Sequence, residues 1–244
     1  MNGKKVIVAI PARYGSTRFP GKPLALLAGK PMIQHVYEKA AASCADEVIV
    51  ATDDQRIADA VAGFGGVAVM TRSDHPSGSD RIQEAVAGRG ADVIINVQGD
   101  EPLIPTALID ELIRVMTADP QPEMGTVAVA AAREKMQDPN RVKVVFGADG
   151  NALYFSRSMI PFLRDGGSDP GVFLHWGIYG YRSDVLAKFV KLPAGKLENC
   201  EKLEQLRALE NGIRIRVITA DCESIGVDTP EDLVEAEPRL KGVL

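Results

Sequence analysis

Four basic side chains lie in one glycine-containing segment near the start of the chain. Residues 11–35 contain no acid but carry Arg13, Arg18, Lys22 and Lys30, although the whole chain has a formal net charge of -5. Glycines and small hydroxyl residues let backbone N–H groups approach phosphate oxygens, and arginine can bind phosphate through two hydrogen bonds. The segment therefore predicts an anion site, and its charge suits a triphosphate. The alternative is a surface loop with hydrated charges.

This segment matches neither of the two common glycine motifs for nucleotides. A Walker A loop has four residues between its glycines and Ser or Thr after Lys, whereas here five residues separate Gly15 from Gly21, and Pro23 follows Lys22. The dinucleotide fingerprint also fails, because residues 63–66 lack the final glycine and precede a predicted strand. The sequence thus disfavours a P-loop protein and an oxidoreductase.

Two acids far apart in the sequence could serve the same anion site through a metal. Asp100 follows a buried strand predicted at 93–97, so it should emerge at the sheet edge where the basic segment lies. Magnesium prefers carboxylate oxygens as ligands, together with substrate phosphates. A turn aspartate is the alternative for Asp100. Near the C-terminus, Thr229 and Pro230 are typical of a helix start, which leaves Asp228 without a structural role.

The elements that must position these side chains follow an alternating pattern in the first half of the chain. β-Branched runs predict strands at 6–10, 47–51, 67–70 and 93–97, and helical patterns lie at 32–42, 55–64, from Ser79 and around 109–116. This alternation predicts an α/β fold with three layers and a mostly parallel sheet. Ligands of such sheets bind at the carboxyl ends of the strands, where the basic segment and Asp100 both lie.

The second half of the chain is richer in predicted strands. Strands are expected at 126–132, 142–146, 152–156, 177–182 and 215–220, with an Asp-Gly hairpin signal at 149–150, a helix at 197–211 and a flexible stretch at 165–171. We expect a single domain over residues 1–244 that carries a β-rich insertion at about 126–200.

Composition excludes several classes of protein. The chain has 244 residues, of which 45% are hydrophobic and 25% charged, and its slight acidity disfavours general nucleic-acid binding. The three cysteines are odd in number and lack zinc-ligand spacing, which favours reduced thiols. No apolar run approaches the roughly 18 residues that cross a bilayer, and the start lacks a secretory signal. We expect a cytoplasmic protein without membrane insertion.

The sequence resembles the sugar-activating cytidylyltransferases, specifically the 3-deoxy-manno-octulosonate (Kdo) cytidylyltransferase family, over nearly its whole length. The motifs that carry this resemblance are Ile10-Pro11-Ala12-Arg13, Ser16-Thr17-Arg18, Pro20-Gly21-Lys22-Pro23, Asn96-Val97-Gln98-Gly99-Asp100-Glu101-Pro102 and residues 226–232, with further matches at 70–75, 77–78, 152–157, 177–179 and 203–207. One departure is Ser79-Asp80-Arg81, where the family usually has Thr-Glu-Arg.

The resemblance implies a nucleotidyltransferase-like fold and a specific reaction. CMP would pass from CTP to the anomeric 2-hydroxyl of Kdo, with release of pyrophosphate, for lipopolysaccharide biosynthesis. Mg²⁺ would be held by Asp100 and Asp228, and the β-rich subdomain would bind the acceptor and form a homodimer. Alternatives that stay open are another acidic sugar such as a sialic acid, the 8-amino relative of Kdo, and a regulatory protein that binds nucleotide without turnover.

The resemblance also assigns residues to each substrate. The nucleotide-binding set is Pro11, Ala12, Arg13, Ser16, Thr17, Arg18, Lys22, Arg72, Ser77 and Gly78, and the catalytic set is Arg13, Arg18, Lys22 and Asp100. The sugar-binding set is Gln98, Arg157, His175, Tyr179, Glu204 and Gln205. From the residues alone, Arg157 and His175 could be structural, Glu204 and Gln205 could lie on a hydrated helix face, and Ser79 could simply cap a helix. The sequence shows no dedicated general base.

Overall fold

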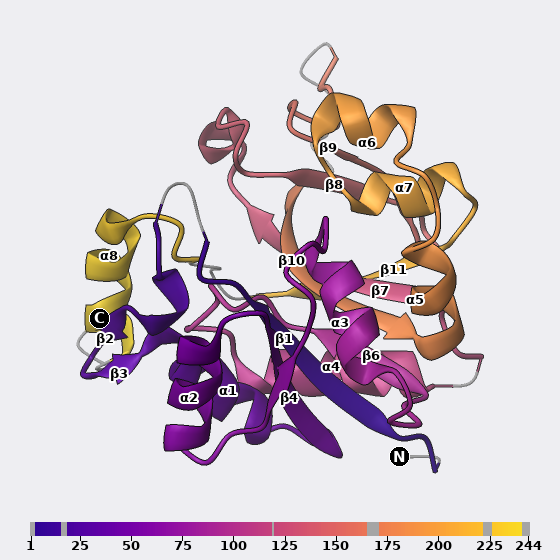
Figure 1. The fold of residues 1–244 in the computed structure, drawn as a ribbon. Coiled ribbons are helices and arrows are strands. Elements are labelled where there is room, and N and C mark those ends of the chain that lie inside the picture. Colours follow the sequence, from indigo (N-terminus) through magenta and orange to yellow (C-terminus); the bar gives the residue numbers. More distant parts are fainter. Residues whose placement is uncertain (1–2, 16–18, 119, 165–170, 222–225, 241–244) are drawn as a thin grey trace.

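The computed structural model describes residues 3–15, 19–118, 120–164, 171–221 and 226–240 as a sheet flanked by helices (Figure 1). The sheet has the strand order β11-β7-β10-β6-β1-β4-β5, and β8 and β9 lie off this path. Its strands are β1 (Val6–Ala12), β4 (Glu47–Thr52), β5 (Ala68–Met70), β6 (Val93–Asn96), β7 (Met124–Ala131), β8 (Lys143–Phe146), β9 (Ala152–Ser156), β10 (Val172–Arg182) and β11 (Ile215–Ala220).

Strand β1 lies at the centre of the parallel part of the sheet. It pairs in parallel with β4 on one side and β6 on the other, and β4 pairs in parallel with β5. Strand β10 is antiparallel to both β6 and β7, and β7 pairs in parallel with β11. All four residues of β6 are buried, as expected for a strand covered on both faces. The predicted mostly parallel sheet is therefore confirmed.

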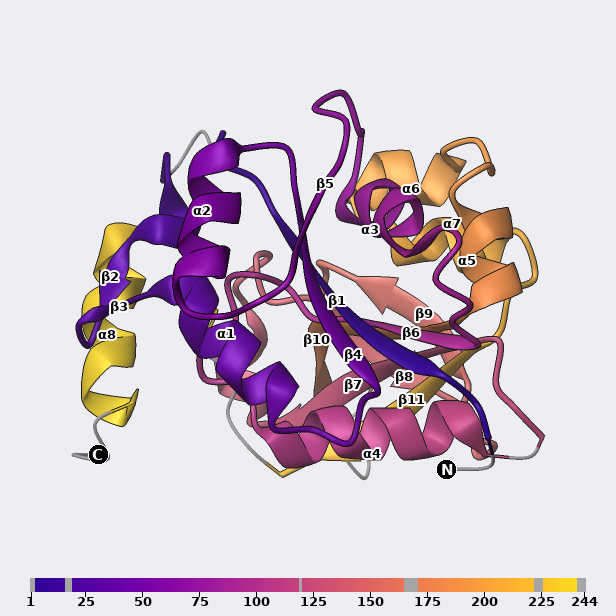
Figure 2. The same ribbon diagram turned by 60° about the horizontal axis from the view of Figure 1, so that its bottom comes forward.

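Helices cover both faces of the sheet, so the predicted three layers are also confirmed (Figure 2). Val6, Val8 and Ile10 pack with residues of α1 (Met32–Ala41), α2 (Gln55–Gly63) and α4 (Thr106–Thr117). The alternate residues Ile7 and Ala9 pack on the opposite face with α3 (Gly78–Val86), α5 (Ser183–Phe189) and α7 (Gln205–Glu210). The alternation of side chains along a strand thus divides the core into two clusters.

The β-rich second half is continuous with this sheet. Strands β7 and β10 belong to the main sheet, whereas β8 and β9 form an antiparallel hairpin that pairs with β10 at one end. The turn of the hairpin is closed by a hydrogen bond from the Gly147 N–H to the Asn151 carbonyl (2.9 Å), and Gly150 supplies a positive φ of 73°. The hairpin predicted from the Asp-Gly signal is present.

Some predicted elements differ from the structure. The helix expected at 197–211 is two helices, α6 (Lys196–Glu201) and α7, because Lys202 takes a left-handed conformation (φ 54°) that ends α6. Helix α5 was not predicted, and β10 begins five residues before the expected strand start at Gly177. Most of the stretch expected to be flexible, residues 165–170, lies outside the described residues.

A small unit joins the two ends of the chain. The short strands β2 (Leu26–Leu27) and β3 (Lys30–Pro31) pair with each other, and Leu27 packs with Met32, Val227 and Ala236. Ala236 belongs to α8 (Pro230–Leu240), which lies beside β2 and β3 in both ribbon views (Figures 1 and 2). Within the described ranges, no helix is both long and apolar enough to cross a membrane.

Candidate active site

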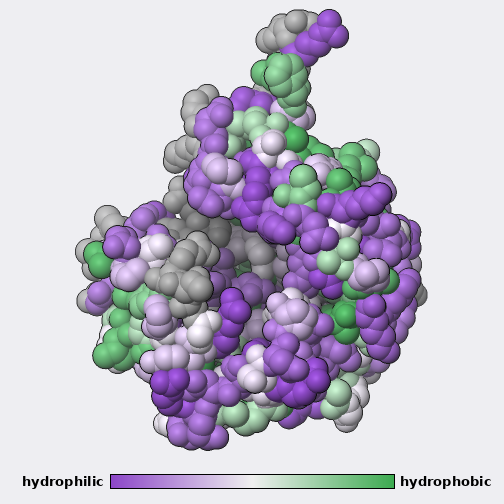
Figure 3. Space-filling model, turned by 45° about the horizontal axis from the view of Figure 1, so that its top comes forward, coloured by the Kyte–Doolittle hydropathy of each residue, from purple (hydrophilic) through white to green (hydrophobic). Residues whose placement is uncertain are grey.

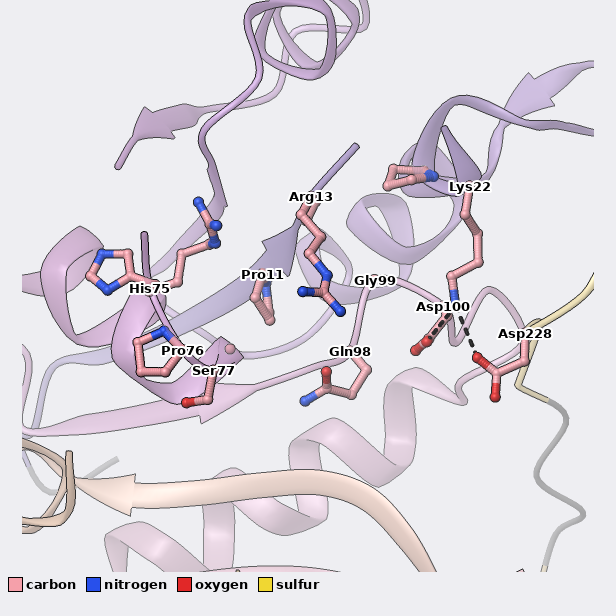
Figure 4. A pocket seen from close by; sticks show the side chains of 14 residues that line it. Pro11, Arg13, Lys22, His75, Pro76, Ser77, Gln98, Gly99, Asp100 and Asp228 are labelled. Atoms are coloured by element: carbon pink, nitrogen blue, oxygen red, sulfur yellow. Dashed lines mark hydrogen bonds and ion pairs between the residues drawn. The ribbon is translucent and has the colours of Figure 1, made fainter. Parts of the chain in front are cut away.

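A cavity of about 290 Å³ opens at the carboxyl ends of β1 and β6 (Figure 4). Figure 3 shows a hollow in this face of the molecule with mostly hydrophilic residues around it. The cavity lining includes the predicted residues Pro11, Ala12, Arg13, Lys22, Ser77, Gly78, Gln98, Asp100 and Asp228. Segments from most of the length of the chain therefore line one cavity.

A backbone hydrogen bond fixes the described part of the basic segment just before Lys22. The Gly21 N–H donates to the Tyr14 carbonyl at 2.9 Å, and Gly21 has a φ of 72°. A Cβ at this glycine would lie 3.1 Å from the Tyr14 ring, so glycine suits both the conformation and the space. Lys22 then begins a short 3₁₀ helix, η1 (Lys22–Leu24). The predicted residues Ser16, Thr17 and Arg18 lie outside the described residues.

The Lys22 ammonium group contacts both candidate metal ligands. Its Nζ donates to Asp100 Oδ2 at 2.7 Å and to Asp228 Oδ1 at 3.1 Å (Figure 4). It also donates to the Val227 carbonyl at 2.9 Å. Two carboxylates separated by more than a hundred residues in the sequence thus share one cation at the edge of the cavity.

Asp228 is held in this place by backbone contacts on both sides. The Val227 N–H donates to the Asp100 carbonyl at 2.9 Å, and the Val227 side chain is fully buried. The Asp232 carboxylate accepts the N–H groups of Asp228 and Thr229 at 2.9 and 2.8 Å, while Thr229 Oγ1 accepts the Asp232 N–H at 3.3 Å. This reciprocal cap fixes the start of α8, as the helix-start signal predicted.

Glu101, next to Asp100, is a buried carboxyl group that the sequence did not single out. Burial and the negative charge of Asp100 raise its pKa to about 8 from an ordinary value of 4.5. Its Oε2 has no hydrogen-bond partner among the described residues. Glu101 is therefore mostly protonated at neutral pH and adds little charge to the acid pair.

The start of α3 forms another wall of the cavity. Ser77 caps this helix, because its Oγ accepts the Asp80 N–H at 3.3 Å and donates to Asp80 Oδ2 at 2.6 Å. The expectation that Ser79 is the cap was wrong: Ser79 lies inside the first turn and is buried. Gly78 lets the helix approach β1, since a Cβ there would lie 3.3 Å from Pro11 Cγ. A helix N-terminus at this position favours an anion.

Two arginines near this wall have different surroundings. Arg72, predicted to bind nucleotide, is exposed and pairs with Glu84 at 3.4 Å, and it is not among the residues that line the cavity. Arg81 lines the cavity, is only 4% exposed, and is held by Thr71 Oγ1 at 2.7 Å and Asp53 Oδ2 at 3.3 Å. Arg81 was missed although it lies in the Ser79-Asp80-Arg81 motif.

A second, smaller hollow of about 90 Å³ adjoins the first. It is lined by Gln98, Tyr179, Glu204 and Gln205, four of the six predicted sugar-binding residues. Gln98 lines both hollows and so connects them. Gln205 is only 4% exposed with no hydrogen-bond partner for its Nε2 in the described chain, and burial raises the pKa of Glu204. The alternative of a hydrated helix face for these two residues is therefore wrong.

The other two predicted sugar residues are not among the residues lining either hollow. His175 Nε2 lies 3.0 Å from Thr126 Oγ1, its ring contacts Phe155 and Tyr179, and burial lowers its pKa to about 3, which keeps it neutral. The Arg157 guanidinium donates to the carbonyls of Pro139, Glu201 and Lys202 at 3.0, 2.6 and 3.3 Å. These contacts tie Arg157 to the backbone at the end of α6 and at Pro139.

Comparisons with known proteins agree on one family. A sequence profile described as Cytidylyltransferase matches residues 7–215. The 3-deoxy-manno-octulosonate cytidylyltransferase of Pelobacter propionicus is 52% identical, covering 98% of this chain and 98% of its own length. That of Geobacter sulfurreducens is 53% identical over 97% of this chain and 99% of its own.

Solved structures show the same relationship. The structure of CMP:2-keto-3-deoxy-manno-octonic acid synthetase complexed with CTP superposes with a TM-score of 0.94 at 45% identity, covering 98% of this chain and 100% of that one. A cytidylyltransferase from Leptospira borgpetersenii shares the fold alone, with a TM-score of 0.64 at 17% identity over 99% of this chain and 88% of that one. The chain therefore belongs to the cytidylyltransferase family, among the 3-deoxy-manno-octulosonate cytidylyltransferases.

Proposed function

We propose that this enzyme transfers CMP from CTP to the anomeric 2-hydroxyl of Kdo and releases pyrophosphate. The observation that carries the proposal is the junction of the two hollows. The larger one brings Arg13, Lys22, Asp100 and Asp228 together, and Gln98 joins it to the smaller one. Relatives that cover nearly the whole chain are named for this activity, and one of them was solved with CTP.

The larger hollow suits the triphosphate of CTP. Arg13 points into it and Lys22 lies at its edge (Figure 4), so both can offset phosphate charge. The capped N-terminus of α3, with Ser77 and Gly78, adds backbone N–H groups on another wall. Arg18 remains a proposed contact, and the role proposed for Arg72 would require its side chain to leave Glu84.

The acid pair fits a magnesium ion by the chemistry of its donors. Asp100 and Asp228 already share one cation, and their side chains are 33% and 50% exposed, so substrate and water can reach them. Magnesium is typically held by one or two carboxylates together with phosphates and water. The described residues hold no group of three or more His, Cys, Asp or Glu placed for a metal, so the protein would supply these two ligands. When bound, the ion would neutralise phosphate charge and acidify the attacking hydroxyl.

The proposed chemistry is an in-line displacement at the α-phosphorus. The 2-hydroxyl oxygen of the sugar forms a bond to this phosphorus, and the bond to the oxygen that bridges to the β-phosphate breaks. Pyrophosphate leaves with the bridging oxygen, and the hydroxyl proton passes to solvent. The chain contributes mainly by holding the two reactants in line and by stabilising charge on the phosphates, with Arg13 and Lys22 on the nucleotide side.

The smaller hollow is the proposed acceptor site. Its lining residues Gln98, Tyr179, Glu204 and Gln205 offer hydrogen-bond donors and acceptors to sugar hydroxyls. Because a buried polar group left without a hydrogen bond costs free energy, these side chains favour a sugar whose hydroxyls match them. His175 contacts the Tyr179 ring and would support it from behind. A role for Arg157 in binding the sugar carboxylate would require it to exchange a backbone carbonyl for the ligand.

The family resemblance further supports three proposals about the setting of the enzyme. We propose that it acts as a homodimer through its β-rich subdomain, that it works in the cytoplasm, and that its product feeds lipopolysaccharide biosynthesis.

An acceptor panel tests the proposed function. Purified protein is incubated with CTP and Mg²⁺ plus Kdo, 8-amino-Kdo or a sialic acid, and pyrophosphate release is measured for each. We expect release to require an acceptor and to be fastest with Kdo or its 8-amino relative. Equal or faster turnover with the sialic acid would reassign the acceptor, and no release with any sugar would favour a regulatory nucleotide-binding protein.

A further inference from the structure

Lys22 occupies the position between the two acids that a metal ion would need. Its Nζ lies within 3.1 Å of one oxygen from each carboxylate and 2.9 Å from the Val227 carbonyl. The Lys22 side chain is only 14% exposed, whereas Asp100 and Asp228 are more open. All three donor directions of the ammonium group therefore point at oxygen atoms of the acid pair and its neighbouring backbone.

An ammonium group and a divalent cation compete for the same oxygens. A metal that binds both carboxylates must take the electron pairs that now accept hydrogen bonds from Lys22, and two cations within bonding distance of the same acids repel each other. Lys22 must therefore move before the acids can share a metal. In this arrangement, Lys22 already compensates the negative charge that would otherwise attract the ion.

The cavity offers Lys22 a second anion only when nucleotide is present. Lys22 lines the same cavity as Arg13 and the start of α3, where the triphosphate is proposed to lie. A lysine side chain has several rotatable bonds and acts as a mobile point charge, so its head can turn from the acids to a phosphate without movement of the backbone. The backbone of η1 can stay fixed during this exchange.

We propose that Lys22 acts as an internal cation that keeps divalent metal from Asp100 and Asp228 until the triphosphate of the nucleotide draws it away. This inference rests on the proposed function, because it takes the two acids as the metal site and the cavity as the triphosphate site. Its consequence is a binding order: metal binds tightly only with nucleotide. The exchange also keeps the charge of the acid pair compensated in both states.

Metal binding to the nucleotide-free protein tests this proposal. Mn²⁺ affinity is measured by electron paramagnetic resonance for the wild type, Lys22→Met and Lys22→Gln, each checked for native secondary structure and thermal unfolding. Lys30→Met is the matched control, because Lys30 also pairs with a carboxylate, Glu38 at 2.8 Å, but lies away from the cavity. A second control, Lys22→Met combined with Asp228→Asn, shows whether the bound ion uses the acid pair.

We expect both Lys22 variants to bind Mn²⁺ without nucleotide at least about tenfold more tightly than the wild type, a change that corresponds to ~1.4 kcal/mol. Lys30→Met should match the wild type, and the double variant should lose the gain. With EDTA present, Lys22→Met should also bind CTP more weakly while its affinity for CMP stays unchanged. Equal Mn²⁺ affinity in the wild type and both Lys22 variants would overturn the proposal, as would a gain that survives Asp228→Asn. Neither result depends on turnover, so the acceptor panel can fail or succeed independently.

Discussion

The loop that carries Gln98 and Asp100 approaches β1 so closely that a side chain at position 99 would be crowded. A Cβ added to Gly99 would lie 3.0 Å from the Pro11 carbonyl oxygen, where an ordinary contact is 3.4 Å or more. Pro11 is fixed in β1, which is paired on both sides. We therefore expect Gly99→Ala to push the loop outward by a few tenths of an ångström rather than to displace the strand.

The expected cost follows from this overpacking. Insertion of one methyl group into a tightly packed site typically destabilises a protein by ~1–3 kcal/mol, and the lower half of this range applies because a loop can yield. The shift would also move Gln98 and Asp100 relative to Lys22, so the rate with CTP and Kdo should fall more than stability alone explains. Misplacement of reacting groups by a fraction of an ångström is costly for an in-line reaction.

Urea unfolding and steady-state kinetics of Gly99→Ala measure both effects. The matched control is Gly63→Ala at the end of α2, where an added Cβ meets nothing within 4 Å. Alanine in a helix should make this control more stable by up to ~1 kcal/mol, with unchanged kinetics. If Gly99→Ala unfolds at the same urea concentration as the wild type and turns over at the same rate, the argument from close approach is refuted.

Three further predictions concern the buried polar groups and the cap of α8. The unfolded chain releases the Glu101 proton near pH 4.5, whereas the folded protein holds it to about pH 8. The free energy of unfolding should therefore fall as the pH rises between these values, by at most ~4 kcal/mol, and Glu101→Gln should remove this decline. The same change in urea stability from pH 5 to pH 8 in the wild type and in Glu101→Gln would contradict this prediction. Asp232→Ala removes the acceptor of the Asp228 and Thr229 N–H groups. It should therefore cost ~1 kcal/mol of stability and raise the Mg²⁺ concentration needed for the half-maximal rate. An unchanged Mg²⁺ dependence would show that Asp232 does not position Asp228. Gln205→Leu should preserve stability, because the buried Gln205 Nε2 has no partner in the described chain. The variant should nevertheless raise the KM for Kdo without changing the KM for CTP. An unaltered KM for Kdo would remove Gln205 from the acceptor site.

Sequence patterns predicted the first half of the fold well because its strands are buried and its helices are amphipathic. The strand expected at 47–51 and the helix at 55–64 match β4 and α2 to within one residue at each end. The position of Asp100 was predictable for the same reason, since it follows a buried strand of a parallel sheet. Local periodicity and strand-end placement were enough for these features.

Features that depend on tertiary contacts left little trace in the sequence. Nothing in the helical pattern expected at 197–211 predicts the left-handed Lys202 that separates α6 from α7. The burial of Arg81 depends on Asp53 and Thr71 from other segments. No spacing rule predicts the hydrogen bond from the Val227 N–H to the Asp100 carbonyl, which brings Asp228 to the cavity. The family resemblance supplied the expectation that Asp228 joins Asp100.

The central claim is that acids from distant parts of the chain form one functional site beside the basic loop. The most direct test compares pyrophosphate release from CTP, Mg²⁺ and Kdo by the wild type and by Asp228→Asn, with urea unfolding as a check of the fold. The account predicts that Asp228→Asn folds normally and turns over at least about 100-fold more slowly, since charge stabilisation at a reacting phosphate is lost. A folded Asp228→Asn protein that releases pyrophosphate at the wild-type rate would contradict it.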